Sequence, residues 1–428
     1  MITAKAFAGK HYAVYGLARS GLATAEALLA SGARVTVWDA KEEARVKAPA
    51  GSEIGNLDEA GLAQFDSLIV TPGLPLNRHP IAQRARNAGV EIIGDIELFA
   101  RARPELPPHK VVGITGTNGK STTTALMHHI LKTAGVPTTM GGNIGLPILA
   151  QDPLPEGGVY VLELSSYQID LTQSLDCEVA VLLNITPDHL DRYDAFEAYR
   201  GSKMRLFDLQ SREHVAVFTG EDQFGYDAYQ DRWEEAHDTT VLAVPRDALD
   251  QEHWPTLQGP HNAQNAAAAI AICQSLGLGE GEIELSLRTY PGLPHRMERI
   301  REKDGVVFVN DSKATNPTAS APALAAFDKI RWICGGQAKT DNLDECAPYF
   351  CHVRKAYTIG EAGELFARLL SPHMLMSRCE TLERAVGEAA AEAELGDTVL
   401  LSPACASFDQ FRDFEQRGDK FRELVEAL

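Results

Sequence analysis

Short apolar runs alternate with longer helical stretches along this 428-residue chain. Near the N-terminus, residues 11–15, 34–39 and 67–71 have the composition of buried strands, and residues 20–31 suit a helix between the first two. Strands joined through helices run parallel, because a parallel crossover needs a dozen residues or more. The alternation therefore predicts an α/β fold built on parallel sheets.

The same alternation starts again twice. A charged, proline-bearing stretch at residues 101–108 suits a linker, and a second series of apolar runs extends from residue 111 to about residue 244. Prolines at 291 and 294 precede a third series that begins at residue 306. Because domains of roughly 150 residues are common, we expect three domains, at residues 1–98, 99–294 and 295–428.

A glycine-rich turn follows the first apolar run of the middle series. It reads Gly-Thr-Asn-Gly-Lys-Ser-Thr at residues 116–122 and leads into a helical stretch. Such a turn directs backbone N–H groups and a helix N-terminus at an anion, so we expect it to bind the phosphates of ATP. Lys120 would reach the β- and γ-phosphates, and the Ser121 hydroxyl would face Mg²⁺. Ile114 stands where the common pattern has its first glycine, so the loop is a variant form.

Candidate metal ligands follow at the ends of the next strands. Glu163 ends an apolar run, and a carboxylate at that position is usually paired or bound to a metal ion. His189 lies on the loop after the following strand, where only its position beside the other candidates singles it out. Lys203 lies on a helical stretch, and its own chemistry indicates nothing more than a partner in a surface ion pair.

The first domain has a weaker sequence signal for nucleotide binding. Its turn at residues 16–21 departs from the dinucleotide pattern at Ala18, and Asp39 ends the second strand. These residues leave open an NAD-dependent oxidoreductase, which NADH titration would detect. A non-catalytic nucleotide-gated binding protein is a further alternative, although Glu163, His189 and Lys203 would then have no use.

Composition excludes several classes of partner. The 59 acidic and 40 basic residues give a net charge of -19, which repels nucleic acid and anionic membranes. The seven cysteines include no C-x-x-C pair, so neither a disulfide framework nor a zinc site follows. No apolar window approaches 18 residues. We therefore expect a cytoplasmic protein without nucleic-acid or membrane partners, and we expect a monomer.

Seven segments resemble those of the Mur ligases of peptidoglycan synthesis, in matching order and over essentially the whole chain. They are Thr-Gly-Thr-Asn-Gly-Lys-Ser-Thr (115–122), Gly-Gly-Asn-Ile-Gly (141–145), Glu-Leu-Ser-Ser-Tyr-Gln (163–168), Asp-His-Leu-Asp-Arg-Tyr (188–193), Gly-Leu-Pro-His-Arg (292–296), Asn-Asp-Ser-Lys-Ala-Thr-Asn (310–316) and Ser-Pro-Ala-Cys-Ala-Ser-Phe-Asp-Gln-Phe (402–411). The resemblance implies a Rossmann-like first domain, a central domain of the P-loop ATPase type and a Rossmann-like C-terminal domain. It also implies an ATP-dependent ligase that joins D-glutamate to UDP-N-acetylmuramoyl-L-alanine through an acyl phosphate.

The resemblance further implies a role for each candidate residue. Lys120, His189 and Lys203 would be catalytic; two Mg²⁺ ions would be held by Ser121, Glu163, His189 and a carbamylated Lys203. The ATP ligands would be Gly116, Thr117, Asn118, Gly119, Lys120, Ser121, Thr122, Asn265, Arg296 and Asp311. The UDP-substrate ligands would be Arg19, Ser20, Asp39, Thr71, Pro72, Gly73, Asn143, Ser165 and Gln168. Those of D-glutamate would be Lys313, Thr315, Lys339, Ser407, Phe408 and Phe414.

Some of these residues also have simpler interpretations. Without the resemblance, Phe408, Phe411 and Phe414 suit the core stripe of a helix, and Asn265 suits a helix amide bonded to the backbone. Related ligases that add L-alanine, a diamino acid or a dipeptide, and folylpolyglutamate synthetase, would share the central domain. Residues 310–316 and 402–411 favour D-glutamate among these substrates.

Overall fold

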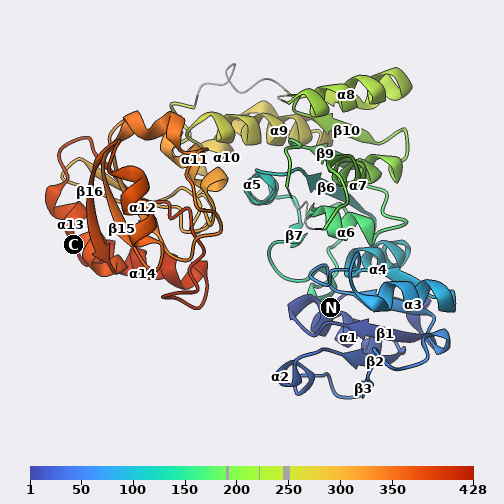
Figure 1. Cartoon of the computed structure of the whole chain (residues 1–428). Helices are drawn as coiled ribbons and strands as arrows, with labels where there is room; N and C mark the ends of the chain where they lie inside the picture. The colour runs from blue at the N-terminus through green and yellow to red at the C-terminus, as the bar shows by residue number, and fades with distance from the viewer. Residues whose placement is uncertain (189–191, 221, 244–250) are drawn as a thin grey trace. The chain divides into compact units, whose positions relative to one another are not determined.

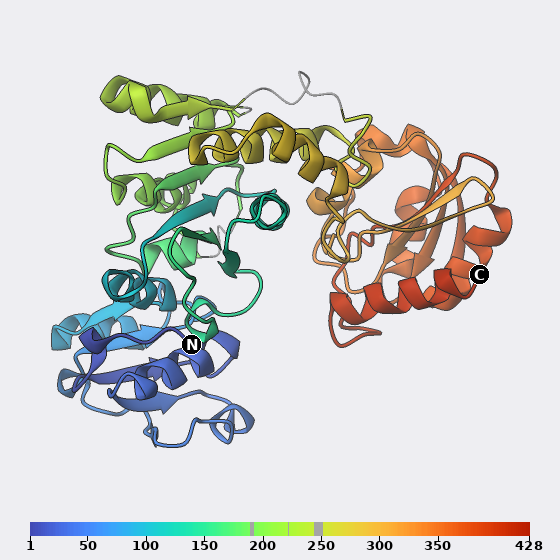
Figure 2. The same cartoon turned by 180° about the vertical axis from the view of Figure 1, so that it is seen from behind.

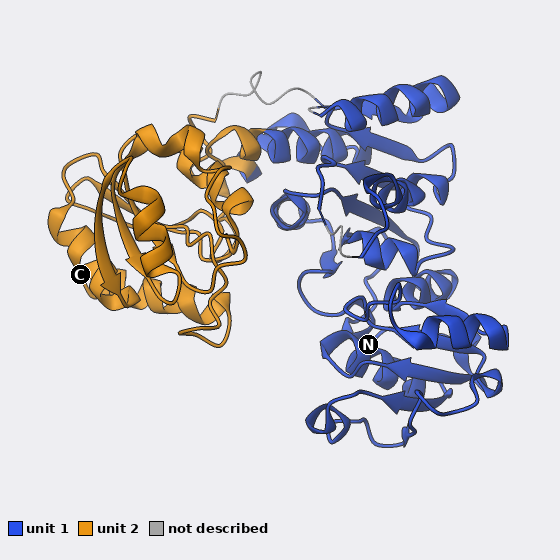
Figure 3. Cartoon of the chain, in the orientation of Figure 1, with its two compact units in different colours: residues 1–248, 264–286 blue, residues 249–263, 287–428 orange. Residues whose placement is uncertain are grey.

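A computed structural model describes residues 1–188, 192–220, 222–243 and 251–428 of the protein (Figure 1). It contains three sheets, flanked by helices (Figure 2). The chain forms two compact units, residues 1–248 with 264–286 and residues 249–263 with 287–428 (Figure 3). The first unit holds two of the sheets and the second unit holds the third. The α/β class and the parallel sheets predicted from the sequence are confirmed.

The N-terminal sheet has five parallel strands in the order β3-β2-β1-β4-β5, which is the Rossmann arrangement. Its strands are β1 (His11–Tyr15), β2 (Arg34–Trp38), β3 (Glu53–Ile54), β4 (Ser67–Val70) and β5 (Glu91–Ile93). Alternate residues of β1 face opposite sides: Tyr12 and Val14 join the core under α1 (Arg19–Ala30), whereas Ala13 and Tyr15 join the core under α3 (Pro80–Ala88). The chain order reverses between β1 and β4, so ligands are expected at the loops that follow these strands.

The central sheet has six parallel strands in the order β11-β10-β9-β6-β8-β7. Its strands are β6 (His109–Thr115), β7 (Thr138–Gly142), β8 (Gly158–Glu163), β9 (Val179–Leu182), β10 (Val215–Phe218) and β11 (Thr240–Leu242). Its helices include α5 (Lys120–Thr133), α6 (Ser166–Asp170), α7 (Phe196–Asp208), α8 (Gln223–Ala236) and α9 (Pro260–Leu276). The loops after β6, β8 and β9 meet at one sheet edge, because these strands are neighbours and run in the same direction.

The C-terminal sheet also has six strands, in the order β12-β13-β17-β14-β15-β16, and only β12 is antiparallel to its neighbour. Its strands are β12 (Glu298–Lys303), β13 (Val306–Asn310), β14 (Ile330–Gly335), β15 (Val353–Ile359), β16 (Leu375–Glu380) and β17 (Thr398–Leu401). Residues of α11 (Pro317–Ala325) and α12 (Gly363–Leu370) form the core on one face, and residues of α13 (Leu382–Glu392) and α14 (Phe414–Glu426) form it on the other.

The predicted linker at residues 101–108 has more structure than we expected. Helix α4 (Asp95–Ala102) continues through Arg101, which pairs with Glu91 at 2.7 Å and with Glu97 at 2.8 Å. A 3-10 turn follows, in which Arg103 pairs with Glu178 at 2.7 Å. Charged residues of the predicted linker therefore hold the segment in place, and α4 crosses the division predicted after residue 98. No helix in the described part of the chain is long and apolar enough to cross a membrane.

Candidate active site

The glycine-rich turn after β6 has the geometry of a phosphate loop. Gly116 and Gly119 have φ values of 153° and 83°, and Gly119 precedes the first residue of α5. A Cβ at Gly119 would lie 2.3 Å from the side-chain oxygen of Asn265, so that position requires glycine and Asn265 lies against the loop. The Lys120 Nζ donates to the carbonyls of Gly116, at 2.9 Å, and Thr117, at 2.8 Å. The loop thus presents a cation and a helix N-terminus at one point.

Asn184 supports this loop, and we did not predict it from the sequence. Its Oδ1 accepts hydrogen bonds from the backbone N–H groups of Thr117, at 3.1 Å, and Asn118, at 2.8 Å. Its Nδ2 donates to the Asn118 carbonyl at 3.2 Å. The only signal in the sequence is a polar amide directly after the apolar run of β9, which does not by itself indicate a partner 66 residues away.

Glu163 has the surroundings of a metal ligand. It pairs with Ile114 across β8 and β6, so its side chain lies beside the start of the phosphate loop. The residue is 2% exposed; Oε1 accepts a hydrogen bond from the Asn143 Nδ2 at 3.0 Å, and no described residue donates to the buried Oε2. An unpartnered buried carboxylate oxygen is costly without a cation, so Glu163 fits Mg²⁺. Ser121, the second residue of α5, is also buried.

The structure does not describe every predicted metal ligand. His189 lies outside the described residues. Within the described ranges no group of three or more His, Cys, Asp or Glu side chains is arranged to hold a metal ion.

Lys203 is buried, and its interpretation as a surface ion-pair partner is wrong. The residue lies on α7, is 1% exposed, and donates from Nζ to the Gly116 carbonyl at 2.8 Å. Burial, reinforced by the nearby charge of Lys120, lowers the pKa of Lys203 well below its usual value. The carbamylation that the family resemblance implies requires the uncharged amine, and burial shifts the protonation equilibrium of Lys203 toward that form.

Asn265 contacts the helix that follows the phosphate loop. Its Oδ1 accepts a hydrogen bond from the Thr123 Oγ1 on α5 at 3.2 Å, so the amide contacts the helix that carries the loop. Both residues are buried.

Most candidate ligands in the N-terminal sheet lie at the carboxyl ends of its strands. The Asp39 carboxylate accepts hydrogen bonds from the backbone N–H groups of Leu17, at 2.7 Å, and Lys41, at 2.9 Å, so it shapes the first turn. A Cβ at Gly16 would lie 2.4 Å from the Thr71 Oγ1, which shows how closely the turn after β4 covers the turn after β1. Pro72 and Gly73 continue that second turn. The Arg19 guanidinium donates to the Gly145 carbonyl at 3.0 Å.

Three further polar candidates have defined surroundings. Ser165 caps α6 and forms a capping box with Gln168, which is buried. Ser20 lies beside Thr71 and the buried Asp95 around a small interior gap, and burial raises the pKa of Asp95 to about 6.

The candidate D-glutamate residues come from neighbouring strands of the C-terminal sheet. The loop after β13 carries Lys313 and Thr315. The loop after the neighbouring strand β17 carries Ser407 and Phe408, and the loop after β14 carries Lys339. The Lys339 Nζ donates to the Thr315 Oγ1 at 3.4 Å. Phe408 is 68% exposed, so the interpretation as a helix core stripe is wrong for it. The Lys313 Nζ lies 3.9 Å from the ring centroid of Phe414, the first residue of α14.

A buried arginine joins these loops. Arg417 on α14 donates to the Ser312 hydroxyl and carbonyl, at 2.9 and 2.8 Å, and to the carbonyls of Cys405 and Ala406, at 3.1 and 3.3 Å. Burial lowers its pKa to about 10. We did not predict Arg417, because an arginine inside an amphipathic helix is ordinarily a surface residue.

Asp311 and Arg296 lie in the second unit. Asp311 accepts hydrogen bonds from the Ser402 hydroxyl at 2.8 Å and from the Met297 N–H at 3.2 Å. Complete burial raises its pKa to about 7. The turn before β12 is tight, since His295 and Met297 have φ values of 62° and 49°.

Comparison with known proteins decides the family. Three family models match: the Mur ligase MurD-like N-terminal domain at residues 10–94, the Mur ligase middle domain at 114–255, and the Mur ligase glutamate ligase domain at 295–405. A relative from Novosphingobium aromaticivorans, named UDP-N-acetylmuramoylalanine--D-glutamate ligase, is 60% identical over 100% of this chain and 97% of its own length. The chain belongs to the Mur ligase family.

Other similar proteins agree with this assignment. A Sphingopyxis alaskensis protein with the same name is 59% identical to this Mur ligase over the full length of both chains. Among solved structures, MurF from Thermotoga maritima in complex with ADP has a TM-score of 0.59 at 16% identity, covering 98% of this chain and 96% of its own. MurC from the same organism has a TM-score of 0.58 at 17% identity, covering 98% and 99%. At such identities the two structures support the fold alone.

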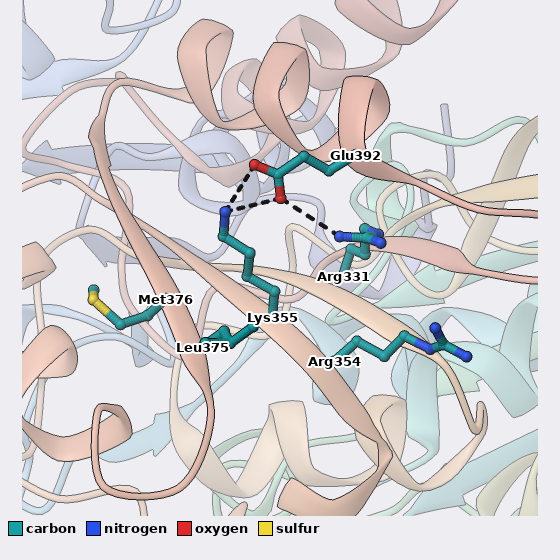
Figure 4. Close-up of a pocket in the computed structure, with 6 residues that line it drawn as sticks. All are labelled: Arg331, Arg354, Lys355, Leu375, Met376 and Glu392. Atoms are coloured by element: carbon teal, nitrogen blue, oxygen red, sulfur yellow. Dashed lines mark hydrogen bonds and ion pairs between the residues drawn. The ribbon is translucent and has the colours of Figure 1, made fainter.

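One hollow in this Mur ligase is separate from the candidate site. It measures about 520 Å³ and is lined by Arg331, Arg354, Lys355, Leu375, Met376 and Glu392 (Figure 4). These residues lie at the amino ends of β14, β15 and β16 and at the end of α13, whereas the candidate ligands follow the carboxyl ends. Each cation already has an acidic partner: Arg331 pairs with Asp397 at 2.7 Å, Arg354 with Glu394 at 3.1 Å and Lys355 with Glu392 at 2.8 Å. The hollow therefore has no unbalanced charge for a substrate.

Proposed function

We propose that this Mur ligase joins D-glutamate to UDP-N-acetylmuramoyl-L-alanine, with conversion of ATP to ADP and phosphate. The observation that carries the proposal is the 60% identity, over the whole chain, to a relative named for that reaction. The phosphate loop, the buried Glu163 and the cationic loops of the C-terminal sheet agree with it. Such a reaction belongs to peptidoglycan precursor synthesis in the cytoplasm.

The proposed reaction has two steps. A carboxylate oxygen of the UDP-linked substrate attacks the γ-phosphorus of ATP, and ADP leaves as an acyl phosphate forms. The amine of D-glutamate then attacks the acyl carbon, loses a proton, and displaces inorganic phosphate from the tetrahedral intermediate. Both steps bring anions together, so catalysis depends on positioning and on cations.

The residues of the loop supply these requirements. Lys120 would leave the carbonyls of Gly116 and Thr117 and bind the β- and γ-phosphates, while the helix N-terminus of α5 orients them. Bound Mg²⁺ would offset the negative charge of the phosphates. Ser121 and Glu163 would hold one ion, and His189 with a carbamylated Lys203 would help to hold a second. The burial of Lys203 beside Gly116 supports this, since burial favours the uncharged amine from which a carbamate forms.

Substrate recognition follows the three sheets. We propose that the turns of the N-terminal sheet bind the UDP end of the substrate, through Arg19, Ser20 and Asp39 among others. Lys313, Lys339 and Ser407 would bind the two carboxylates of D-glutamate. The remaining ligand assignments implied by the family resemblance, the domain divisions at 1–98, 99–294 and 295–428, and the monomeric state belong to the same proposal.

Phosphate release tests the proposal directly. The purified protein would be assayed with ATP, Mg²⁺ and UDP-N-acetylmuramoyl-L-alanine against D-glutamate, L-glutamate, L-alanine, a diamino acid and a dipeptide. We expect release with D-glutamate alone, and none when Lys120 is replaced by Ala. Release with L-alanine or the diamino acid but not with D-glutamate would overturn the substrate assignment.

A further inference from the structure

Arg192 links the N-terminal and central sheets of the first unit. It lies in the loop between β9 and α7, and its guanidinium donates to three consecutive carbonyls in the turn that follows β4. The distances are 2.9 Å to Leu74, 3.2 Å to Pro72 and 3.4 Å to Gly73. Three converging carbonyls form a strongly negative point, so they require a donor with several N–H groups in a fixed plane, which only arginine has.

The same guanidinium is also held from the central side. Its Cζ lies 4.2 Å from the ring centroid of Tyr167, and that ring stacks on Tyr193 at 5.9 Å with an interplanar angle of 13°. The Tyr193 hydroxyl bonds to Asp170 at 2.8 Å and to the Ser202 hydroxyl at 3.2 Å. Ser202 directly precedes Lys203, so a continuous set of contacts joins Arg192 to the helix that carries the buried lysine.

The turn that Arg192 holds covers the first glycine turn. Thr71 begins it, donates its N–H to the Tyr15 carbonyl at 3.2 Å, and occupies the space that a Cβ at Gly16 would need. Under the proposed function, the UDP end of the substrate binds at these turns and its carboxylate reacts at the phosphate loop of the central sheet. The spacing between the two sheets therefore determines where the carboxylate lies.

We propose that Arg192 is a positioning residue, which sets the spacing between the UDP-binding turns and the phosphate loop. This inference rests on the proposed function. Arg192 itself would contact neither ATP nor the reacting carboxylate. Its loss would leave each nucleotide site intact and misplace one relative to the other, and a displacement of about 1 Å can reduce the rate about 100-fold.

The test compares Arg192→Ala with the wild type in phosphate release and in binding. We expect kcat to fall about 10- to 100-fold, whereas the KM for ATP and the Kd for UDP alone change less than about threefold. The Kd for UDP alone reports binding at the turns of the N-terminal sheet and nothing of the central sheet. Arg200→Ala is the matched control. Arg200 lies on α7, and its Cζ also lies over an aromatic ring, 5.5 Å from the ring centroid of Phe224. It should retain wild-type kcat.

Arg192→Lys keeps the inference testable if the alanine variant fails to fold. A lysine keeps the charge near Tyr167 but cannot serve three carbonyls in one plane, so kcat should lie between the wild type and Arg192→Ala. A kcat equal to that of the wild type in either folded variant would overturn the inference. So would a rise in the Kd for UDP as large as the fall in kcat. If the wild type itself releases no phosphate with D-glutamate, the proposed function fails, and the inference fails with it.

Discussion

Replacing Glu163 by Gln removes one negative charge from the end of β8 and changes the shape of the side chain very little. The glutamine oxygen can still accept the hydrogen bond from Asn143 that now measures 3.0 Å. Its amide nitrogen would take the place of Oε2, to which no described residue donates. The free energy of unfolding of the ligand-free protein should therefore change by only about 1 kcal/mol.

The effect on metal-dependent chemistry should be much larger. At about 4 Å and an effective dielectric constant of about 20, one unit of negative charge contributes about 4 kcal/mol for each unit of charge on the cation. That energy corresponds to about a thousandfold in binding or rate. We thus expect Glu163→Gln to lose at least about 100-fold in kcat and to need far more Mg²⁺ for half-maximal activity.

Two measurements check this reasoning. Phosphate release is titrated with MgCl₂, and the thermal unfolding midpoint is measured with ADP in the presence of Mg²⁺ or EDTA. The wild type should be stabilised more by ADP with Mg²⁺ than with EDTA, whereas the variant should not distinguish the two. Glu156→Gln is the control, because this exposed carboxylate precedes the opposite end of β8. The reasoning is refuted if Glu163→Gln retains both the wild-type kcat and the wild-type response to Mg²⁺.

Three further changes test other parts of the site. Lys203→Ala should reduce kcat about 100-fold or more, and added short-chain carboxylic acids should partly restore phosphate release by replacing the carbamate; a fully active variant would exclude the modification. The pKa of Asp311 is raised from 3.8 to about 7, so its protonated form stabilises the fold and this stabilisation is lost as pH rises toward 7. Asp311→Asn should therefore gain about 2 to 3 kcal/mol of stability relative to the wild type between pH 5 and pH 8, measured by denaturant unfolding, and a constant difference would contradict the raised pKa. Arg417→Met should lower the free energy of unfolding by roughly 3 kcal/mol, because four hydrogen bonds to Ser312, Cys405 and Ala406 are lost. The same variant should raise the KM for D-glutamate. An unchanged KM would show that Arg417 does not position the loops that bind this substrate.

Features that depend on local chain geometry were predictable. The strand before the phosphate loop, the glycines within it and the helix after it lie within one short segment, and the structure has them in that order. The placement of Asp39 and Glu163 was predictable for a related reason, since each ends an apolar strand and parallel strands bring their carboxyl ends to one edge.

Residues whose role depends on a distant partner were not predictable. Lys203 looks like a surface lysine on a helical stretch, and only its contact with Gly116, 87 residues away, shows that it is buried beside the loop. Phe408 shows the opposite error: three aromatic residues at helical spacing suggest a core, yet α14 begins only at Phe414 and Phe408 is exposed.

The sequence by itself determined the α/β class, the variant phosphate loop and the family, because apolar periodicity, glycine turns and motif order are properties of short segments. Tertiary structure alone decided which polar groups meet. Asn184 reaches the loop amides, Arg417 donates to three carbonyls on two loops, and Arg192 reaches a turn more than 100 residues away. These contacts arise where loops from neighbouring strands converge at a sheet edge. The strand order that makes them neighbours is set by packing of the whole sheet, which no short segment of the chain specifies.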